Sequence, residues 1–150
     1  MNPDLQTFLR ARLDQDEQLA RRASEHASAE WLVNEHNDVV LWWPPDPDEA
    51  ENERRLGHSV TADSWRGADV DRGMAPHIAR HDPARVLREV EAKRKLLGHY
   101  EDAVVSLANA GPNGEVHDLM TGAVNTLRAV LIDHVQIYAD HPDYREEWRP

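Results

Sequence analysis

Apolar residues recur every three or four positions in three long stretches, which is the spacing of one face of an α-helix. The first stretch opens with Pro3, a residue suited to the first helical position, and predicts a helix over residues 3–28. The other two predict helices over about 83–110 and 115–138. Their expected apolar faces are Val86, Val90, Leu97, Tyr100, Val104 and Leu107, and Val116, Met120, Ala123, Leu127, Val130, His134 and Ile137.

The last two helices are separated only by Gly111–Gly114, a tight breaker that predicts an antiparallel helical hairpin. Gly122 and Ala123 lie inside the third helix. Glycine lowers helix propensity by about 1 kcal/mol relative to alanine, so its presence there indicates that another helix comes close. The helix over 3–28 is the expected neighbour.

Between the first and second long helices the pattern changes. Two short β-favouring runs, separated by a five-residue polar loop, predict a β-hairpin over about 31–43. Residues 44–73 are acidic and have little periodicity, so we expect an exposed loop there, with 59–61 as a candidate third strand. A short helix over 75–81 and a tail over 139–150 complete the chain.

These elements predict a mainly α or α+β fold, in which a three-helix antiparallel bundle carries a long C-terminal helical hairpin and a small inserted β-hairpin. A chain of 150 residues is close to the common size of one domain. We therefore expect residues 1–150 to form a single domain.

The charge balance narrows the classes of partner. The chain has 28 acidic and 17 basic side chains, for a formal net charge of -11, which disfavours nucleic acid phosphates and anionic lipid surfaces. There is no apolar run of membrane-spanning length, and the N-terminus does not follow the layout of a signal peptide, so we expect a cytoplasmic protein. Cysteine is missing, which excludes thiolate chemistry and leaves histidine and carboxylates as the strong metal ligands.

Tryptophan is over-represented, with five residues against a single phenylalanine, and tryptophan anchors interfaces disproportionately. The adjacent pair Trp42 and Trp43 ends the predicted β-hairpin, where successive side chains point to opposite faces. Asp46, Asp48 and Glu49 follow at once. We expect these five residues to form a surface that binds another protein, although a charge run of this kind is more often a solvated loop.

A rival hypothesis is a metal site. His77 and His81 are four residues apart, so on a continuous helix both imidazoles lie on one face, as in many zinc sites. Asp82 and His141 are candidate further ligands, and the His81-Asp82 doublet also fits the residue order of metal-dependent phosphohydrolases. The simpler interpretation is that His81 and Asp82 shape a helix start.

Three motifs, at 8–17 (FLRARLDQDE), 79–94 (ARHDPARVLREVEAKR) and 138–150 (YADHPDYREEWRP), carry a resemblance that covers roughly half the chain. With them the chain resembles an uncharacterised domain-of-unknown-function family of actinobacteria and their phages. The resemblance implies a cytoplasmic, phage or prophage setting. It brings no activity, ligand or catalytic residue.

Nucleophilic triads, phosphate-binding glycine loops and zinc-protease motifs are not found in the sequence. The leading expectation is therefore a non-enzymatic protein-interaction or accessory factor of phage or prophage origin, with no cofactor. The alternative is a His/Asp metal-binding protein holding a divalent ion such as zinc, with or without phosphohydrolase activity.

Overall fold

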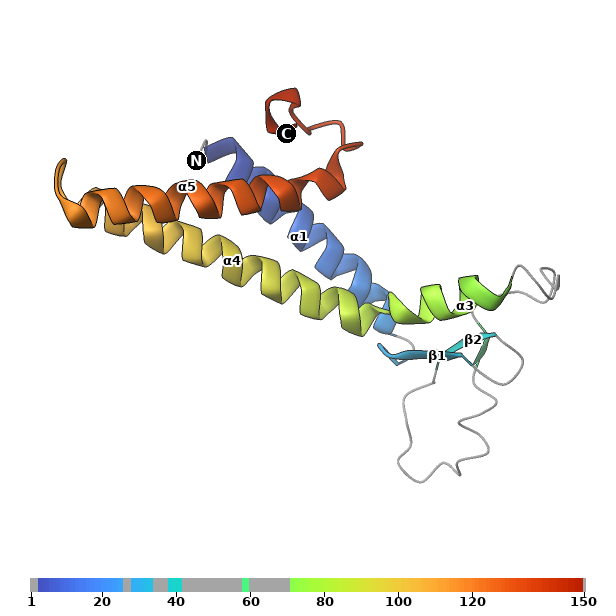
Figure 1. Ribbon diagram of the computed structural model, residues 1–150. Coiled ribbons are helices and arrows are strands. Elements are labelled where there is room, and N and C mark those ends of the chain that lie inside the picture. The colour runs from blue at the N-terminus through green and yellow to red at the C-terminus, as the bar shows by residue number, and fades with distance from the viewer. Residues whose placement is uncertain (1–2, 26–27, 34–37, 42–57, 60–70, 150) are drawn as a thin grey trace, which may run out of the picture. The chain divides into compact units, whose positions relative to one another are not determined.

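The structure is a computed structural model that describes residues 3–25, 28–33, 38–41, 58–59 and 71–149 (Figure 1). The expectation of a mainly helical fold with a small inserted β-hairpin is confirmed. In chain order the described elements are α1 (Pro3–Ser24), β1 (Trp31–Val33), β2 (Val39–Leu41), β3 (His58–Ser59), α3 (Asp71–Arg80), α4 (Pro83–Asn109), α5 (Glu115–Val135), and the 3-10 helices η2 (Gln136–Tyr138) and η3 (Glu146–Trp148).

The chain divides into two compact units. One contains Met1–Gln15 together with Val90–Pro150, and the other contains Asp16–Glu89. The boundaries fall inside α1 and α4, so each of these helices contributes one part to each unit. The expectation of a single folding domain stays a prediction.

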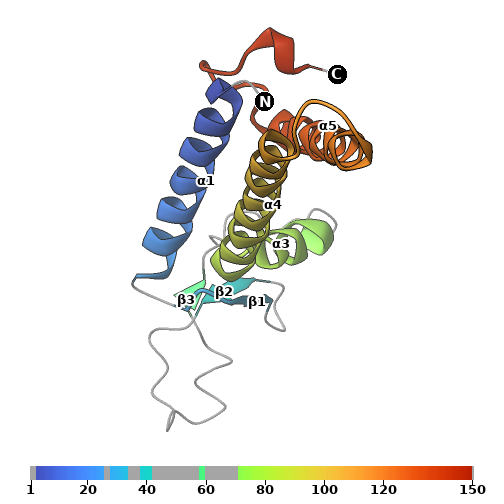
Figure 2. The same ribbon diagram turned by 90° about the vertical axis from the view of Figure 1, so that its left-hand side faces the viewer.

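The first unit contains the bundle. In it α4 and α5 run antiparallel as a helical hairpin (Figure 1), and the first part of α1 lies beside α4 (Figure 2). The connection between α4 and α5 contains Gly111 at φ +75° and Gly114 at φ +118°, a backbone region that side chains disfavour. The buried side chains are Leu5, Phe8, Leu9 and Leu13 of α1, Val90, Leu97 and Tyr100 of α4, Leu131 and Val135 of α5, and Trp148 of η3.

Two exposed ion pairs join α1 to α4 within this unit, Arg10 with Glu101 and Arg94 with Asp14, the latter at 2.5 Å. Pairs at the solvent surface contribute little to stability. The buried leucines and aromatic residues therefore hold α1 in the bundle, and the ion pairs only help to set its register.

Several predicted boundaries are wrong by about one turn. The first helix ends at Ser24, whose hydroxyl donates back to the carbonyls of Ala20 and Arg21, a bond that competes with the helical backbone pattern. The helix α3 begins at Asp71, so the predicted loop over 44–73 extends too far. The short helix predicted over 75–81 therefore begins one turn earlier, and Pro76 lies inside it.

The predicted apolar face of α5 is right in part. Four residues of the predicted stripe are half-buried, namely Met120, Ala123, Leu127 and His134. Val116 and Val130 are exposed instead, as is Ile137 in η2, and the fully buried residues Leu131 and Val135 lie outside the predicted stripe. Apolar residues occur on most sides of this helix, so their spacing does not single out one face and the neighbouring elements decide.

The expected close approach of the first helix to Gly122 is not found either. A Cβ atom built at Gly122 meets nothing within 4 Å. The described residues of one chain therefore supply no packing reason for the glycine.

The second unit is built around a small antiparallel sheet in the order β1-β2-β3. Trp31 pairs with Leu41 and Val33 with Val39, and α3 lies against both β1 and β2. Val39 and Val40 are almost fully buried. The third strand is confirmed at His58–Ser59, although the predicted 59–61 extends beyond the described residues.

Candidate functional site

The predicted protein-binding residues follow β2 directly in the chain. Trp42, Trp43, Asp46, Asp48 and Glu49 all lie outside the described residues. The strand before them ends at Leu41, which pairs with both neighbouring strands. The expectation that these residues bind a partner stays a prediction.

The histidine pair of the metal hypothesis lies at the end of α3. The rings of His77 and His81 are close, with centroids 4.3 Å apart and planes inclined by 39°. The Nδ1 atom of His81 lies 2.8 Å from the carbonyl oxygen of His77. Since a carbonyl only accepts, a hydrogen bond at this contact requires the proton on Nδ1 of His81.

Asp82 has a structural role. Its Oδ1 accepts from the backbone N–H of Arg85 at 2.7 Å, the bond of a helix N-cap, and its Oδ2 lies 3.4 Å from the backbone nitrogen of Trp31. Asp82 is 9% exposed, and the backbone bond from Ala84 to the carbonyl of Ala29 lies beside it in the chain. The interpretation of Asp82 as a helix start is thus confirmed, and the residue also ties β1 to α4.

His141, the fourth proposed ligand, belongs to the C-terminal segment of the first unit. Its Nδ1 accepts from the backbone N–H of Asp143 at 3.1 Å, and its ring meets Phe8 edge-on at 5.6 Å. In the part of the chain that the structure describes, no group of three or more His, Asp or Glu side chains is arranged to hold a metal ion. The metal hypothesis stays a prediction.

The C-terminal segment folds back onto α1 and η2. Trp148 is 3% exposed and packs against Phe8, with ring centroids 4.9 Å apart, and against Tyr144 at 5.6 Å. Gln136 fixes the segment, because its Nε2 donates to the carbonyl of Trp148 at 2.6 Å and its Oε1 accepts from the Tyr144 hydroxyl at 3.0 Å. An aromatic cluster around Phe8 therefore closes one end of the bundle.

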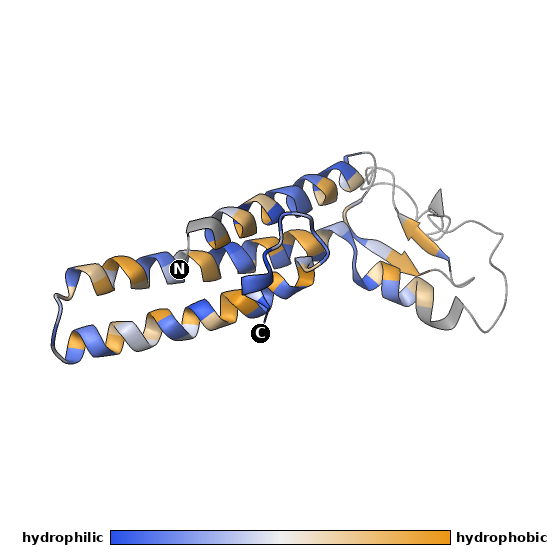
Figure 3. Ribbon diagram, turned by 90° about the horizontal axis from the view of Figure 1, so that it is seen from above, coloured by the Kyte–Doolittle hydropathy of each residue, from blue (hydrophilic) through white to orange (hydrophobic). Residues whose placement is uncertain are grey.

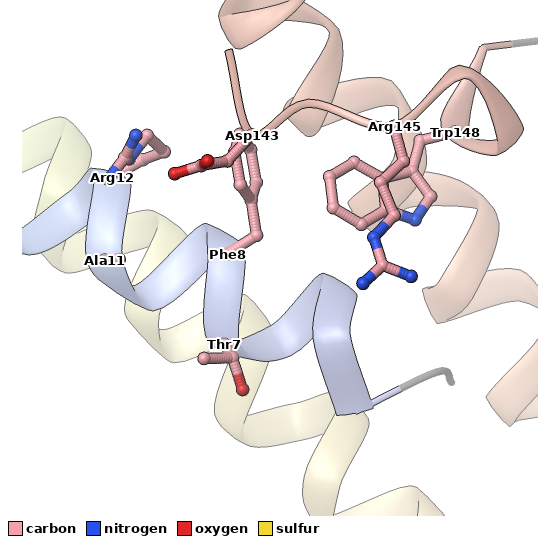
Figure 4. Close-up of a pocket in the computed structure, with 7 residues that line it drawn as sticks. All are labelled: Thr7, Phe8, Ala11, Arg12, Asp143, Arg145 and Trp148. Atoms are coloured by element: carbon pink, nitrogen blue, oxygen red, sulfur yellow. The ribbon is translucent and has the colours of Figure 1, made fainter. Parts of the chain in front are cut away.

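Beside this cluster is an open pocket of about 470 Å³, which we call the Arg12 pocket (Figure 4). Its volume falls within the range of about 300–1,000 Å³ that is common for small-molecule sites. One wall comes from α1 and the other from the C-terminal segment. The lining residues are Thr7, Phe8, Ala11, Arg12, Asp143, Arg145 and Trp148.

Two arginines lie on aromatic rings in this pocket. The guanidinium carbon of Arg12 is 5.3 Å from the Phe8 ring centroid, and that of Arg145 is 5.8 Å from the Trp148 ring. The Nε and Nη1 atoms of Arg12 are buried and have no hydrogen-bond partner among the described residues. Asp143 extends toward Arg12 from the opposite wall (Figure 4).

A second candidate surface lies at the far end of the helical hairpin. We call residues 101–130 the hairpin tip. Every residue of the tip is exposed or half-buried. Val105, Val116 and Leu119, which we call the tip surface, are 59%, 61% and 67% exposed. Hydrophobic residues continue along both helices into the tip (Figure 3).

The tip also carries little charge. Between Ala103 and Leu127, Glu115 and Asp118 are the sole Asp, Glu, Lys or Arg residues, although nearly a third of the whole chain is charged. Both begin α5, where acidic residues favour the positive end of the helix dipole. The helix faces of the tip are therefore apolar or neutral.

Sequence reasoning missed both surfaces. The charge-poor run 103–127 was a usable signal for the tip, because surface helices normally carry charge on their solvent face. No local pattern in the sequence indicates the Arg12 pocket. It forms between residues more than 130 positions apart, which only the folded chain brings together.

Together, the fold and these surfaces define a small helical protein with an exposed, charge-poor helical hairpin. The Family of unknown function (DUF6221) matches residues 2–150, so the chain belongs to this family, in line with the resemblance seen in its motifs. No curated protein and no solved structure gives a significant match. Among the described residues, no helix combines the length and the apolar character needed to cross a membrane.

Proposed function

We propose that this protein is a non-enzymatic accessory factor that works by binding protein, and that the tip surface is where it binds a second copy of itself. The observation that carries the proposal is the exposure of Val105, Val116 and Leu119 within residues 103–127, a run with only two charged side chains. Exposed apolar patches of this kind mark interaction sites.

The charge of the chain favours a second copy as the occupant. Two molecules of net charge -11 repel each other, and the repulsion is weakest where their contacting surfaces carry few charges. A basic partner would instead be attracted to the acidic segments elsewhere in the chain. The tip is therefore suited to a like-charged molecule.

The size and shape of the tip fit a symmetric pair. Its α5 portion, Glu115–Val130, is about 24 Å long, and two helices side by side are about 20 Å wide. A flat face of this size covers about 480 Å², which is below the roughly 800 Å² per partner of a standard interface and corresponds to a weak, concentration-dependent contact. Two antiparallel hairpins packed face to face form a four-helix arrangement with two-fold symmetry.

Gly122 supports the same arrangement. It weakens α5, and no atom of the described residues lies within 4 Å of a Cβ built at this position. A helix of a second copy that approaches closely at that point would give the glycine a packing reason that the described residues of one chain do not supply.

Sedimentation velocity tests the proposal. We expect a dimer for the natural chain, a monomer for Leu119→Glu, and a dimer for the matched control Leu19→Glu, which changes a leucine of similar exposure outside the tip. A natural chain that is monomeric up to high micromolar concentration would contradict self-association.

Two further expectations belong to this proposal. The motif resemblance supports a cytoplasmic role in a phage or prophage of actinobacteria, and Trp42 and Trp43 remain the surface expected to bind a different protein. Elemental analysis of chelator-free protein, with His77→Ala/His81→Ala as comparison, tests the metal-binding alternative. Stoichiometric metal that the double variant loses would favour that alternative.

A further inference from the structure

We propose that the Arg12 pocket binds a small anionic molecule, one that presents a single carboxylate or phosphate to Arg12. This inference is independent of self-association, because the pocket lies between α1 and the C-terminal segment and shares no residue with the tip surface. A ligand of this class would place its anionic group beside the guanidinium and any apolar group against the rims of Phe8 and Trp148.

The first observation is the unsatisfied guanidinium. Arg12 is half-buried, and two of its three nitrogens, Nε and Nη1, are shielded without an acceptor among the described residues. Leaving donors of a charged group unpaired and away from water is costly, so such groups call for a partner. The planar guanidinium matches the two oxygens of a carboxylate or phosphate.

The second observation is the balance of charge around the pocket. Its lining carries two arginines and one carboxylate, which leaves it with a net positive charge in a chain whose total is -11. Arg145 also has a carboxylate partner, since its Nη1 lies 3.7 Å from Glu147. Arg12 is therefore the cation that is available to a ligand.

The third observation is the rigidity of the pocket wall. Arg12 lies on the ring of Phe8, which is buried and contacts Trp148, and Gln136 holds the backbone of Trp148 in place. A preorganised arginine loses less conformational freedom when it binds an anion. The aromatic cluster thus positions the group that would recognise the ligand.

Asp143 lowers the affinity of this pocket for an anion. It extends toward Arg12 across the pocket, and its carboxylate would repel an incoming anion (Figure 4). Replacing Asp143 with asparagine keeps its size and removes the charge. The substitution should therefore tighten anion binding, the opposite of the effect expected at Arg12.

The experiment is an NMR titration of the full chain with two probes, inorganic phosphate and benzoate, following the Nε–H signal of Arg12 and the indole N–H of Trp148. We expect saturable shifts for at least one probe, binding about tenfold weaker in Arg12→Lys, and binding several-fold tighter in Asp143→Asn. Arg21→Lys is the matched control, because Arg21 is an exposed α1 arginine paired with Glu17, and its affinity should be unchanged.

The probes separate the two ligand chemistries. Saturation by phosphate alone identifies a phosphate-bearing ligand, and saturation by benzoate alone identifies an aromatic carboxylate. If neither probe saturates, or if Arg12→Lys and Asp143→Asn leave the affinity unchanged, the proposal is wrong. The titration of the natural chain and of Asp143→Asn decides the matter even if Arg12→Lys does not fold.

Discussion

The two ends of the α4–α5 hairpin have similar apolar content, but their apolar side chains differ in burial. At the base, which we define as Val90–Tyr100 and Leu131–Val135, the apolar residues Leu97, Tyr100 and Leu131 are almost fully buried. At the tip, Val105, Val116 and Leu119 are mostly exposed. Helical spacing alone therefore does not create a core, since burial requires a second element to cover the face.

The largest expected difference between the two ends concerns truncation of a large side chain. We expect Trp148→Ala to lower the free energy of unfolding by about 3–5 kcal/mol, because it empties the site between Phe8 and Tyr144. Leu119→Ala at the tip should change it by less than about 0.5 kcal/mol. Urea unfolding at low protein concentration measures both, and equal losses would erase the distinction between base and tip.

The second-largest change in the free energy of unfolding is expected from the loss of hydrogen bonds made by Gln136. Gln136→Ala removes the donor to the Trp148 carbonyl and the acceptor for the Tyr144 hydroxyl, and should cost about 1–2 kcal/mol. Asn125→Ala, at an exposed position of the tip, is the control and should be close to neutral. If Gln136→Ala is also neutral, the C-terminal segment does not depend on this bridge.

A third change should act in opposite directions on the monomer and on the dimer. Gly122→Ala should stabilise monomeric protein by about 1 kcal/mol, because alanine favours the helix and the position has space for a methyl group. The same methyl group should weaken self-association where a second helix comes close. Unfolding at low concentration and sedimentation at high concentration measure the two effects, and stronger association would contradict the proposed contact.

The smallest effect at neutral pH is expected at Tyr100 in the base. Burial raises the pKa of its phenol, with a partly opposing influence from Arg128, and its hydroxyl has no hydrogen-bond partner among the described residues. The neutral phenol is favoured in the folded state, so its contribution is complete below the unfolded pKa of about 10 and is lost as pH rises through the higher folded value.

Tyr100→Phe should therefore be neutral or stabilising by up to about 1 kcal/mol at pH 7, since it removes an unpaired buried hydroxyl. It should also flatten the loss of stability above about pH 10. Thermal unfolding across this pH range measures both. An unchanged alkaline profile in the variant would show that another group titrates.

The sequence predicted the helices well and the faces of the helices less well. The buried residues of α1 and α4, such as Leu13 and Tyr100, follow a clear period because polar residues separate them. In α5 apolar residues are so frequent that the period does not distinguish Leu131 from Val130. Which of the two is buried depends on the elements packed against α5, whose positions are not encoded locally.

The candidate sites show the same limit. The helix-capping role of Asp82 was predictable, because its proline neighbour and backbone partner lie next to it in the chain. The position of Arg12 on Phe8 beside Trp148 was not, because it depends on the docking of the C-terminal segment. Charge depletion over 103–127 is visible in the sequence, but it becomes informative only once the exposure of the tip is known.

The most direct test of the account is hydrogen exchange followed by mass spectrometry, at protein concentrations below and above the midpoint of self-association. The account predicts that exchange protection of peptides over 115–127 in the tip rises with concentration, while protection of the base around Leu97, Tyr100 and Leu131 stays constant. Protection of the tip that is the same at every concentration would contradict the claim that a second copy covers it.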